Sequence, residues 1–208
     1  MLQQLNESIK KGKAKDAKAL TAQLLADGVP AGEILDQGLL SAMSEIGVRF
    51  KNNEIFVPEV LIAARALNMA TTILKPALVA EGVEPIGKAI ICTVKGDLHD
   101  IGKNLVRMML EGVGLETFDL GVDVDGAKIV EKIRETEADI VALSALLTTT
   151  MTEQKAIIQA IEEAGLRDKV KIMVGGAPCT PEWATEIGAD AYTADAASAA
   201  ETAKSFIC

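Results

Sequence analysis

The pattern of apolar residues changes its period once along this chain of 208 residues. From the start to about Leu78, apolar residues recur at the three- and four-residue spacing of one helix face, as Leu35, Leu39, Ala42 and Ile46 do. No segment in this region alternates in the manner of a half-buried strand. The pattern therefore predicts a small bundle of helices.

A polar segment with glycine and proline, residues 79–85, reads as a linker to a region with a different pattern. Beyond it, short apolar runs alternate with longer amphipathic stretches, which predicts five βα units and a parallel sheet covered by helices on both faces. We therefore expect two domains, residues 1–80 and 88–208. The expected strands are residues 89–94, 117–120, 140–143, 171–174 and 191–193, and the expected helices begin near Gly102, Gly126, Thr152, Pro181 and Ala196.

Composition and charge narrow the class of protein. Apolar residues make up 49% of the chain but aromatic residues only 3%, so the core must be aliphatic. The net charge of −9 leaves the protein without the basic field that phosphate backbones require, so we expect no nucleic-acid partner. The polar N-terminus lacks the apolar core of a signal peptide, and no stretch approaches the roughly 18 apolar residues of a membrane span. We expect a cytoplasmic protein without a membrane partner.

The three cysteines carry no site of their own. Cys92, Cys179 and Cys208 are widely spaced, odd in number and outside any CxxC pattern. This spacing favours reduced thiols over a disulfide framework or a structural zinc site.

Three loops of the predicted sheet are candidates for binding a ligand. Ligands of parallel α/β sheets bind beyond the carboxyl ends of the strands, where the strand order reverses. The loops that follow the first, third and fourth strands are residues 95–102, 144–150 and 175–178.

His99, the only histidine, lies in the first of these loops. A lone histidine is more often structural than a metal ligand, but a neutral imidazole binds transition metals well, and Asp97 is placed to accept its other N–H. One protein ligand cannot complete a structural zinc site, so further donors would come from a cofactor. Haem is conceivable, but a cavity between βα loops and a helical bundle better suits a large planar macrocycle with a long tail.

The same loops resemble those of a known family. Residues 96–102 contain the DxHxxG signature of cobalamin-binding domains, residues 144–146 match their SxL and residues 175–176 their GG. Residues 53–60 and 63–66 are similar to the helical cap of methionine synthase and of free-standing methyltransferase corrinoid proteins. The resemblance covers nearly the whole chain and implies a four-helix-type cap bundle followed by a flavodoxin-like, five-stranded parallel-sheet domain.

The resemblance implies a cobalamin-type corrinoid that alternates between methylcob(III)alamin and cob(I)alamin. In this family the cofactor's own base leaves the cobalt, and the protein histidine, here His99, becomes the metal ligand, with Asp97 and a hydroxyl as a relay. Methionine synthase has serine where this chain has Thr150. Small residues would line a slot for the displaced nucleotide tail. The expected cofactor-binding residues are Gly96, Asp97, Leu98, His99, Asp100, Ile101, Gly102, Ser144, Leu146, Thr148, Gly175, Gly176 and Ala196.

Several of these residues have a plain structural alternative. Thr148 and its neighbours could cap the following helix, Asp100 could stabilise a helix N-terminus, and any of the glycines could serve a turn. Met108 and Met109 have the spacing of core residues, and Trp183 is most simply a packing residue.

The family function is methyl transport. The resemblance implies a non-catalytic carrier that accepts a methyl group from a substrate-specific methyltransferase and presents it to an acceptor methyltransferase that uses tetrahydrofolate or a thiol, with a reductive activase as a third partner. Residues 144–151 and 170–183 look most like the methylamine and quaternary-amine proteins, while methanol and aryl-ether systems stay open. A B12-dependent regulator and a small subunit of an adenosylcobalamin mutase are the alternatives. The cap favours the carrier, with residues 79–87 as its expected hinge.

Overall fold

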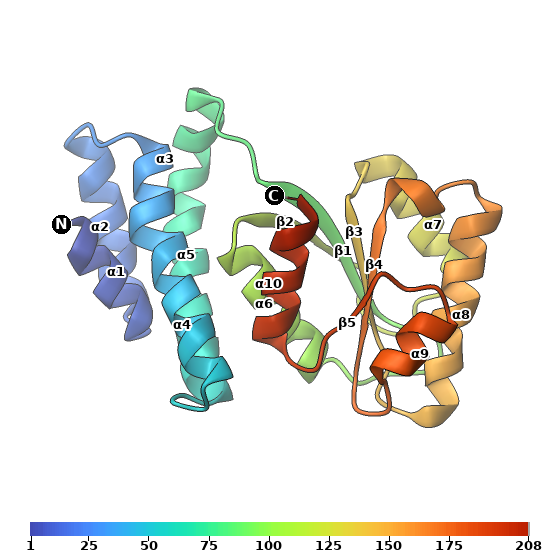
Figure 1. Cartoon of the computed structure of the whole chain (residues 1–208). Coiled ribbons are helices and arrows are strands. Elements are labelled where there is room, and N and C mark those ends of the chain that lie inside the picture. The colour runs from blue at the N-terminus through green and yellow to red at the C-terminus, as the bar shows by residue number, and fades with distance from the viewer. Residues whose placement is uncertain (208) are drawn as a thin grey trace. The chain divides into compact units, whose positions relative to one another are not determined.

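The computed structural model describes residues 1–207 and divides into two compact units (Figure 1). One unit consists of Met1–Pro85 and Gly112–Gly114, and the other of Ile86–Glu111 and Leu115–Cys208. The expected domain ranges, 1–80 and 88–208, stay predictions. The expectation of a reduced thiol at Cys208 lies outside the described residues.

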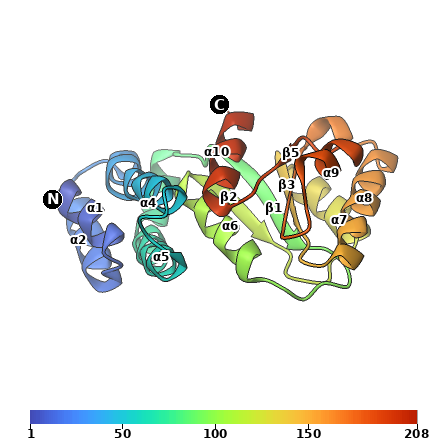
Figure 2. The same ribbon diagram turned by 60° about the horizontal axis from the view of Figure 1, so that its bottom comes forward.

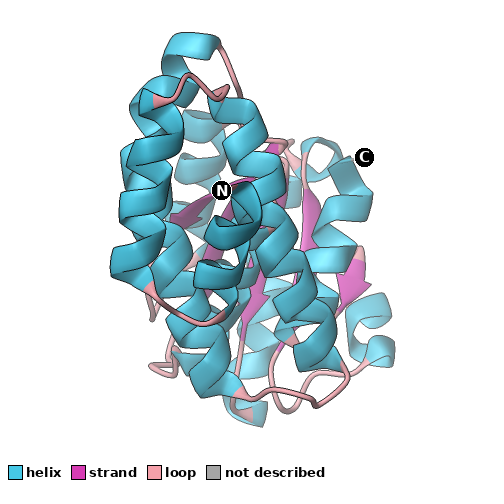
Figure 3. Cartoon of the chain, turned by 90° about the vertical axis from the view of Figure 1, so that its left-hand side faces the viewer, coloured by secondary structure: helices cyan, strands magenta, loops and turns pink. Residues whose placement is uncertain are grey.

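Every regular element described between residues 1 and 85 is a helix (cyan in Figure 3). Residues 31–51 form one continuous helix with a π-helical stretch in its middle, so this region contains four separate helices. Leu5, Ile9, Leu39 and Leu74 are fully buried at its centre. The elements are α1 (Leu2–Lys10), α2 (Ala14–Ala26), α3 (Ala31–Glu33), η1 (Ile34–Leu40), α4 (Ser41–Lys51) and α5 (Val57–Glu81).

Helix α5 corrects the expectation that no stretch of the chain has the length and apolar composition of a membrane span. By length and composition it could span a membrane, because an 18-residue window within it reaches a mean hydropathy of 1.3 although charged residues interrupt it. Val60, Leu67, Leu74 and Leu78 recur at helical spacing and are buried. The core helix of a globular bundle passes the same test, and α5 packs chiefly against α2.

The end of α5 also differs from the expected linker. Residues 79–81 are helical, so the helix extends beyond the predicted boundary. Both carboxylate oxygens of Glu81 accept the backbone N–H of Ala31, at 3.0 and 2.9 Å, and Leu78 is buried one turn earlier. These contacts tie the last turn of α5 to the start of α3.

The second unit is a five-stranded parallel sheet with the order β2-β1-β3-β4-β5, which confirms the predicted fold class. Helices α6 and α10 cover one face, and α7, α8 and α9 cover the other (Figures 1 and 2). Ile90, Val141 and Ile172 of the strands pack in the core with residues of α7, α8 and α9. The elements are β1 (Gly87–Thr93), α6 (Ile101–Gly112), β2 (Leu115–Asp119), α7 (Gly126–Thr136), β3 (Ile140–Ser144), α8 (Thr148–Glu163), η2 (Arg167–Lys169), β4 (Lys171–Gly175), α9 (Pro181–Glu186), β5 (Ala191–Tyr192) and α10 (Ala196–Ile207).

The strand order reverses between β1 and β3, so the loops after these two strands are neighbours, as the predicted binding edge requires. Helix α8 begins at Thr148, earlier than the expected start near Thr152. Leu147 is extended, and its carbonyl accepts the N–H groups of Thr150 and Met151, which closes the first helical turn. Since Leu147 stands at the N-cap, the capping alternative for the threonines is wrong.

Candidate functional site

The carboxylate of Asp97 is fully buried at the switch point and receives four hydrogen bonds. Oδ1 accepts the backbone N–H of His99 at 3.1 Å and lies 2.7 Å from Nδ1 of its ring. Oδ2 accepts the backbone N–H of Leu146 and the hydroxyl of Thr150, both at 2.7 Å. The structure therefore brings together the aspartate, histidine and hydroxyl of the expected relay, from the loop after β1 and the first turn of α8.

These contacts keep the carboxylate of Asp97 ionised. Burial alone would raise the pKa of Asp97, but the hydrogen bonds from Thr150, Leu146 and His99 outweigh it and hold the pKa well below its ordinary value. An ionised carboxylate only accepts hydrogen bonds, so Nδ1 of His99 carries the proton that lies between them. In the neutral imidazole this leaves the lone pair of Nε2 free for a ligand.

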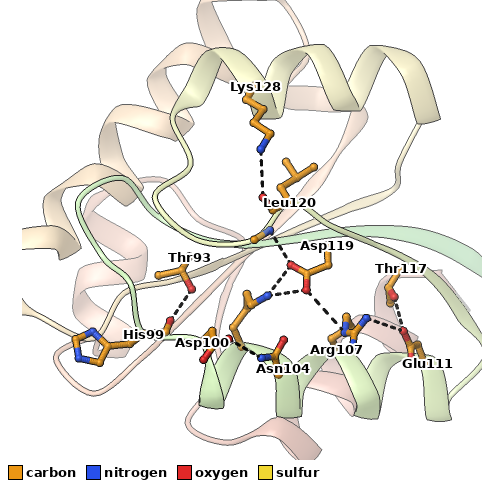
Figure 4. A network of polar contacts seen from close by, with 12 residues as sticks. Thr93, His99, Asp100, Asn104, Arg107, Glu111, Thr117, Asp119, Leu120 and Lys128 are labelled. Carbon is orange, nitrogen blue, oxygen red and sulfur yellow. Dashed lines mark hydrogen bonds and ion pairs between the residues drawn. The ribbon is translucent and has the colours of Figure 1, made fainter. Parts of the chain in front are cut away.

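Exposed apolar side chains lie in the same loop as His99 and in the loop after β3. The side chain of His99 is half-exposed and points away from the polar network shown in Figure 4. Leu98 and Ile101, in the same loop and at the start of α6, are 72% and 78% exposed, and Leu146 and Leu147 are also exposed. Large apolar side chains exposed at the ligand-binding edge of a sheet are the usual lining of a site for an apolar ligand.

His99 belongs to no cluster of metal-binding side chains among the described residues. Among residues 1–207, no group of three or more His, Cys, Asp or Glu side chains is arranged to hold a metal ion. The described residues therefore fit a metal that brings most of its own donors, as a corrinoid macrocycle does, and that takes one imidazole nitrogen from the chain.

The four expected slot glycines differ in what lies beside them. At Gly102 a Cβ would meet no atom within 4 Å, so the space there is open. At Gly96 it would meet Cγ2 of Thr150 at an ordinary 3.7 Å, and at Gly175, which ends β4, it would meet the backbone oxygen of Thr193 at a tight 3.1 Å. Gly176 has a φ of 123°, and a Cβ there would lie 1.8 Å from the backbone oxygen of Ala145. The chain's own backbone thus requires Gly176, and its contact with a cofactor stays a prediction.

The other expected contact residues lie along the same edge. Ser144 ends β3 and Thr148 is exposed in the first turn of α8. Asp100 directly precedes α6 and accepts a hydrogen bond from the side chain of Asn104 at 3.1 Å, and Ala196 begins α10 with its side chain buried. Their contacts with a cofactor are predictions.

The residues with structural alternatives belong to the packing. Met109 is buried, and Met108 is partly buried. The indole N–H of Trp183 donates to Oε1 of buried Gln154 at 2.9 Å. Cys92 is free and buried, and burial raises its pKa to about 12, so the thiol is not a nucleophile at neutral pH.

Sequence reasoning missed an ion pair between the buried side chain of Lys103 and the partly exposed carboxylate of Asp119, the residue labelled in Figure 4. Nζ of Lys103 lies 2.6 Å from both carboxylate oxygens of Asp119. Burial raises the pKa of Asp119, but the hydrogen bonds from Lys103 and Gly121, together with the positive charges of Lys103 and Arg107, lower that pKa overall. The hydroxyl of Thr93 also donates to the backbone oxygen of His99 at 2.8 Å. A lysine between apolar positions of an amphipathic helix was the available signal for the ion pair.

Comparisons with known proteins match both the helical region and the sheet region of the chain. A family model described as a B12 binding domain matches residues 87–203, and a second model with the same description matches residues 1–75. The dimethylamine corrinoid protein of Methanosarcina barkeri is 42% identical over 100% of this chain and 97% of its own length. This chain belongs to the corrinoid proteins. The corrinoid cofactor expected from the sequence is supported by both domain models.

Two solved structures match this chain over nearly its whole length. A cobalamin-binding protein from Desulfitobacterium hafniense DCB-2 is 30% identical with a TM-score of 0.81, over 100% of this chain and 99% of that one. The methanol:cobalamin methyltransferase complex from Methanosarcina barkeri contains a similar fold, with 26% identity and a TM-score of 0.87, over 99% of this chain and 79% of the other.

Proposed function

We propose that this corrinoid protein carries a methyl group between two methyltransferases and that Nε2 of His99 is the protein's ligand to cobalt. The observation that carries the proposal is the Asp97–His99 contact, which places the ring proton on Nδ1 and leaves Nε2 with a free lone pair. The bound corrinoid supplies the cobalt centre that takes up and gives away the methyl group. The general role of methyl carrier is supported by the family to which the chain belongs.

The chain's own residues would hold and orient the cofactor. The four hydrogen bonds on Asp97 fix the imidazole at 2.7 Å from a buried carboxylate, so the ring presents Nε2 in one orientation. The exposed side chains of Leu98 and Ile101 would cover apolar surface of the macrocycle, and the open space at Gly102 would admit its tail. In this account the protein holds the reacting group and performs no reaction alone.

The proposed methyl source is a methylamine. Relatives that match most of this chain are named for dimethylamine and trimethylamine. We therefore propose a dimethylamine-specific methyltransferase as the donor partner, an acceptor methyltransferase that uses tetrahydrofolate or a thiol, and a reductive activase, all in the cytoplasm. A complex in which a similar fold is paired with a methyltransferase supports direct docking of this kind.

A labelling experiment separates the possible methyl sources. The full chain, reconstituted with hydroxocobalamin and reduced, is mixed with a dimethylamine-specific methyltransferase and ¹³C-methyl dimethylamine, and label on the protein-bound corrinoid is measured by mass spectrometry. Parallel reactions use trimethylamine or methanol with their own methyltransferases.

We expect the label to be taken up fastest from dimethylamine, and more slowly by His99→Ala loaded to the same cofactor content. Uptake from methanol alone would overturn the amine assignment. If none of the donors transferred label to the protein-bound corrinoid, the carrier role would be overturned.

A further inference from the structure

A second loop lies against the histidine loop and is outside the motifs that identify the family. Residues 120–125, between β2 and α7, continue the pairing of β1 and β2 beyond the strand ends. The backbone N–H of Thr93 donates to the oxygen of Gly121 at 3.0 Å, and that of Val124 donates to Thr93 at 3.2 Å. Val94 and Val124 also form a parallel bridge.

This loop is itself held in place by the ion pair of Lys103 and Asp119. Oδ1 of Asp119 accepts the backbone N–H of Gly121 at 2.9 Å, while Lys103 of α6 lies against the same carboxylate. Lys128 of α7 donates from its side chain to the backbone oxygen of Leu120 at 3.2 Å. The loop is therefore a fixed support rather than a free connection.

Asp123 joins the support to the histidine loop through two hydrogen bonds. Its Oδ1 accepts the backbone N–H of Gly96 at 2.7 Å, and its own backbone N–H donates to the oxygen of Asp97 at 3.1 Å. Its φ of 55° lies in the left-handed region, which aspartate tolerates better than most residues. The side chain and the backbone of one residue thus hold both ends of the Gly96–Asp97 dipeptide.

We infer that Asp123 is a positioning residue of the corrinoid site: its clamp on Gly96 and Asp97 sets where the buried carboxylate meets the ring of His99. The inference rests on the proposed ligation by His99. On the far side of Asp97, Leu146 and Thr150 hold the carboxylate itself. On the near side, Asp123 holds the backbone that carries it.

The need for such a clamp follows from the geometry. Four donors must meet the two oxygens of Asp97 at 2.7–3.1 Å, so a small displacement of its backbone would lengthen several bonds at once. Gly96 directly precedes Asp97 and has a φ of 77°. Because glycine lacks a Cβ, the backbone at this position has more conformational freedom than it would have with another residue. Without the carboxylate of Asp123, the N–H of Gly96 would turn to water and the loop could shift.

The chain offers a matched control two residues away. Oδ1 of Asp125 accepts the backbone N–H of Lys128 at 3.1 Å and so caps α7. Asp125 lies in the same loop and is exposed as Asp123 is, but none of its described hydrogen bonds reaches the histidine loop. Loss of either carboxylate removes one hydrogen bond to a backbone N–H, and only one of them holds the site.

The test compares full-length Asp123→Gly, Asp123→Asn and Asp125→Ala with wild type. Glycine keeps the left-handed backbone and removes the carboxylate, whereas asparagine keeps both the backbone preference and an acceptor oxygen. Three quantities are measured: the thermal midpoint of the apoprotein, the affinity for hydroxocobalamin, and the nitrogen splitting in the electron paramagnetic resonance spectrum of the cobalt(II) holoprotein. For the third, the protein is labelled with ¹⁵N-histidine, so that a doublet reports coordination by the imidazole of His99.

We expect Asp123→Gly to weaken hydroxocobalamin binding by about tenfold, as loss of a supporting partner of a metal ligand does, and to lower the fraction of cobalt that shows histidine nitrogen splitting. Asp123→Asn should restore most of both quantities. Asp125→Ala should lower the thermal midpoint and leave affinity and splitting unchanged.

Two results would overturn the inference alone: Asp123→Gly with wild-type affinity and splitting, or Asp125→Ala with the same losses as Asp123→Gly. Absence of histidine nitrogen splitting in wild type would instead overturn the proposed ligation, and the inference with it.

Discussion

Two of the three strand ends that carry the family motifs are constrained in different ways. After β1, the buried carboxylate of Asp97 meets four donors and orients a ring nitrogen away from the protein. After β4, Gly176 is required because any Cβ would strike the backbone oxygen of Ala145. The first motif orients a histidine nitrogen toward a site for a cofactor, whereas the second allows two loops of the chain to approach each other. A glycine motif alone does not distinguish room for a cofactor from room for the chain itself.

The largest expected effect concerns Gly176. Gly176→Ala adds a Cβ 1.8 Å from the backbone of Ala145 at a φ of 123°, so we expect the free energy of unfolding to fall by about 3 kcal/mol or more, even without cofactor. Urea denaturation of the apoprotein measures it, with Gly102→Ala as the control because a Cβ there meets open space. A loss of corrinoid affinity with unchanged stability would show that Gly176 serves the ligand.

Asp97→Asn should have the next largest effect. An asparagine presents an NH₂ group to donors that now meet an acceptor, which leaves buried groups unpaired and costs about 1–3 kcal/mol of stability. We expect affinity for hydroxocobalamin to fall about 10- to 100-fold. Asp97→Glu keeps a carboxylate that accepts from all the donors, so it tests whether the length of the side chain matters. Asparagine with wild-type affinity would contradict the role of the carboxylate.

The same variant has a defined pH signature. Because the native contacts hold the pKa of Asp97 below its unfolded value, its contribution to stability is present above about pH 4 and is lost as the pH falls toward the native pKa. Acid unfolding of the apoprotein should therefore be less steep for Asp97→Asn than for wild type. Equal steepness would mean that Asp97 does not ionise with a lowered pKa.

Gly102→Leu should affect the cofactor without affecting the fold. The new side chain enters open space near the start of α6, so the free energy of unfolding should change by less than about 1 kcal/mol. If the tail occupies that space, affinity should fall about tenfold or more. Isothermal titration with hydroxocobalamin measures it, and unchanged affinity would place the tail elsewhere.

The smallest effect is expected at Thr150. Thr150→Val removes one of the four donors to Asp97 and should cost about 1 kcal/mol of stability, whereas Thr150→Ser keeps the hydroxyl and should stay closer to wild type. Denaturation of the two apoproteins checks the difference. Equal stability of the valine variant and wild type would show that the remaining three donors suffice.

Most of the fold and the centre of the site could be predicted from sequence. The change from helical spacing to short apolar runs indicated the helical region and the parallel sheet, and the loop order located His99 and Asp97 at the switch point. The predicted start of α8, near Thr152, was wrong because Leu147, which is not a polar residue, stands at the N-cap. The end of α5 has a local signal in Gly82, which is left-handed at the C-cap. The contacts of Glu81 with Ala31 and of Asp123 with Gly96 have no such signal, since the residues that meet lie far apart along the chain.

The central claim is that Nε2 of His99 binds cobalt, and isotopic labelling tests it without any mutation. Because the chain contains a single histidine, growth on ¹⁵N-histidine labels one imidazole alone. The cobalt(II) holoprotein is then examined by electron paramagnetic resonance beside an unlabelled sample. If His99 is the ligand, the nitrogen splitting changes from a triplet to a doublet. A triplet in both samples would show that another nitrogen, such as the cofactor's own base, holds the cobalt, and would contradict the account.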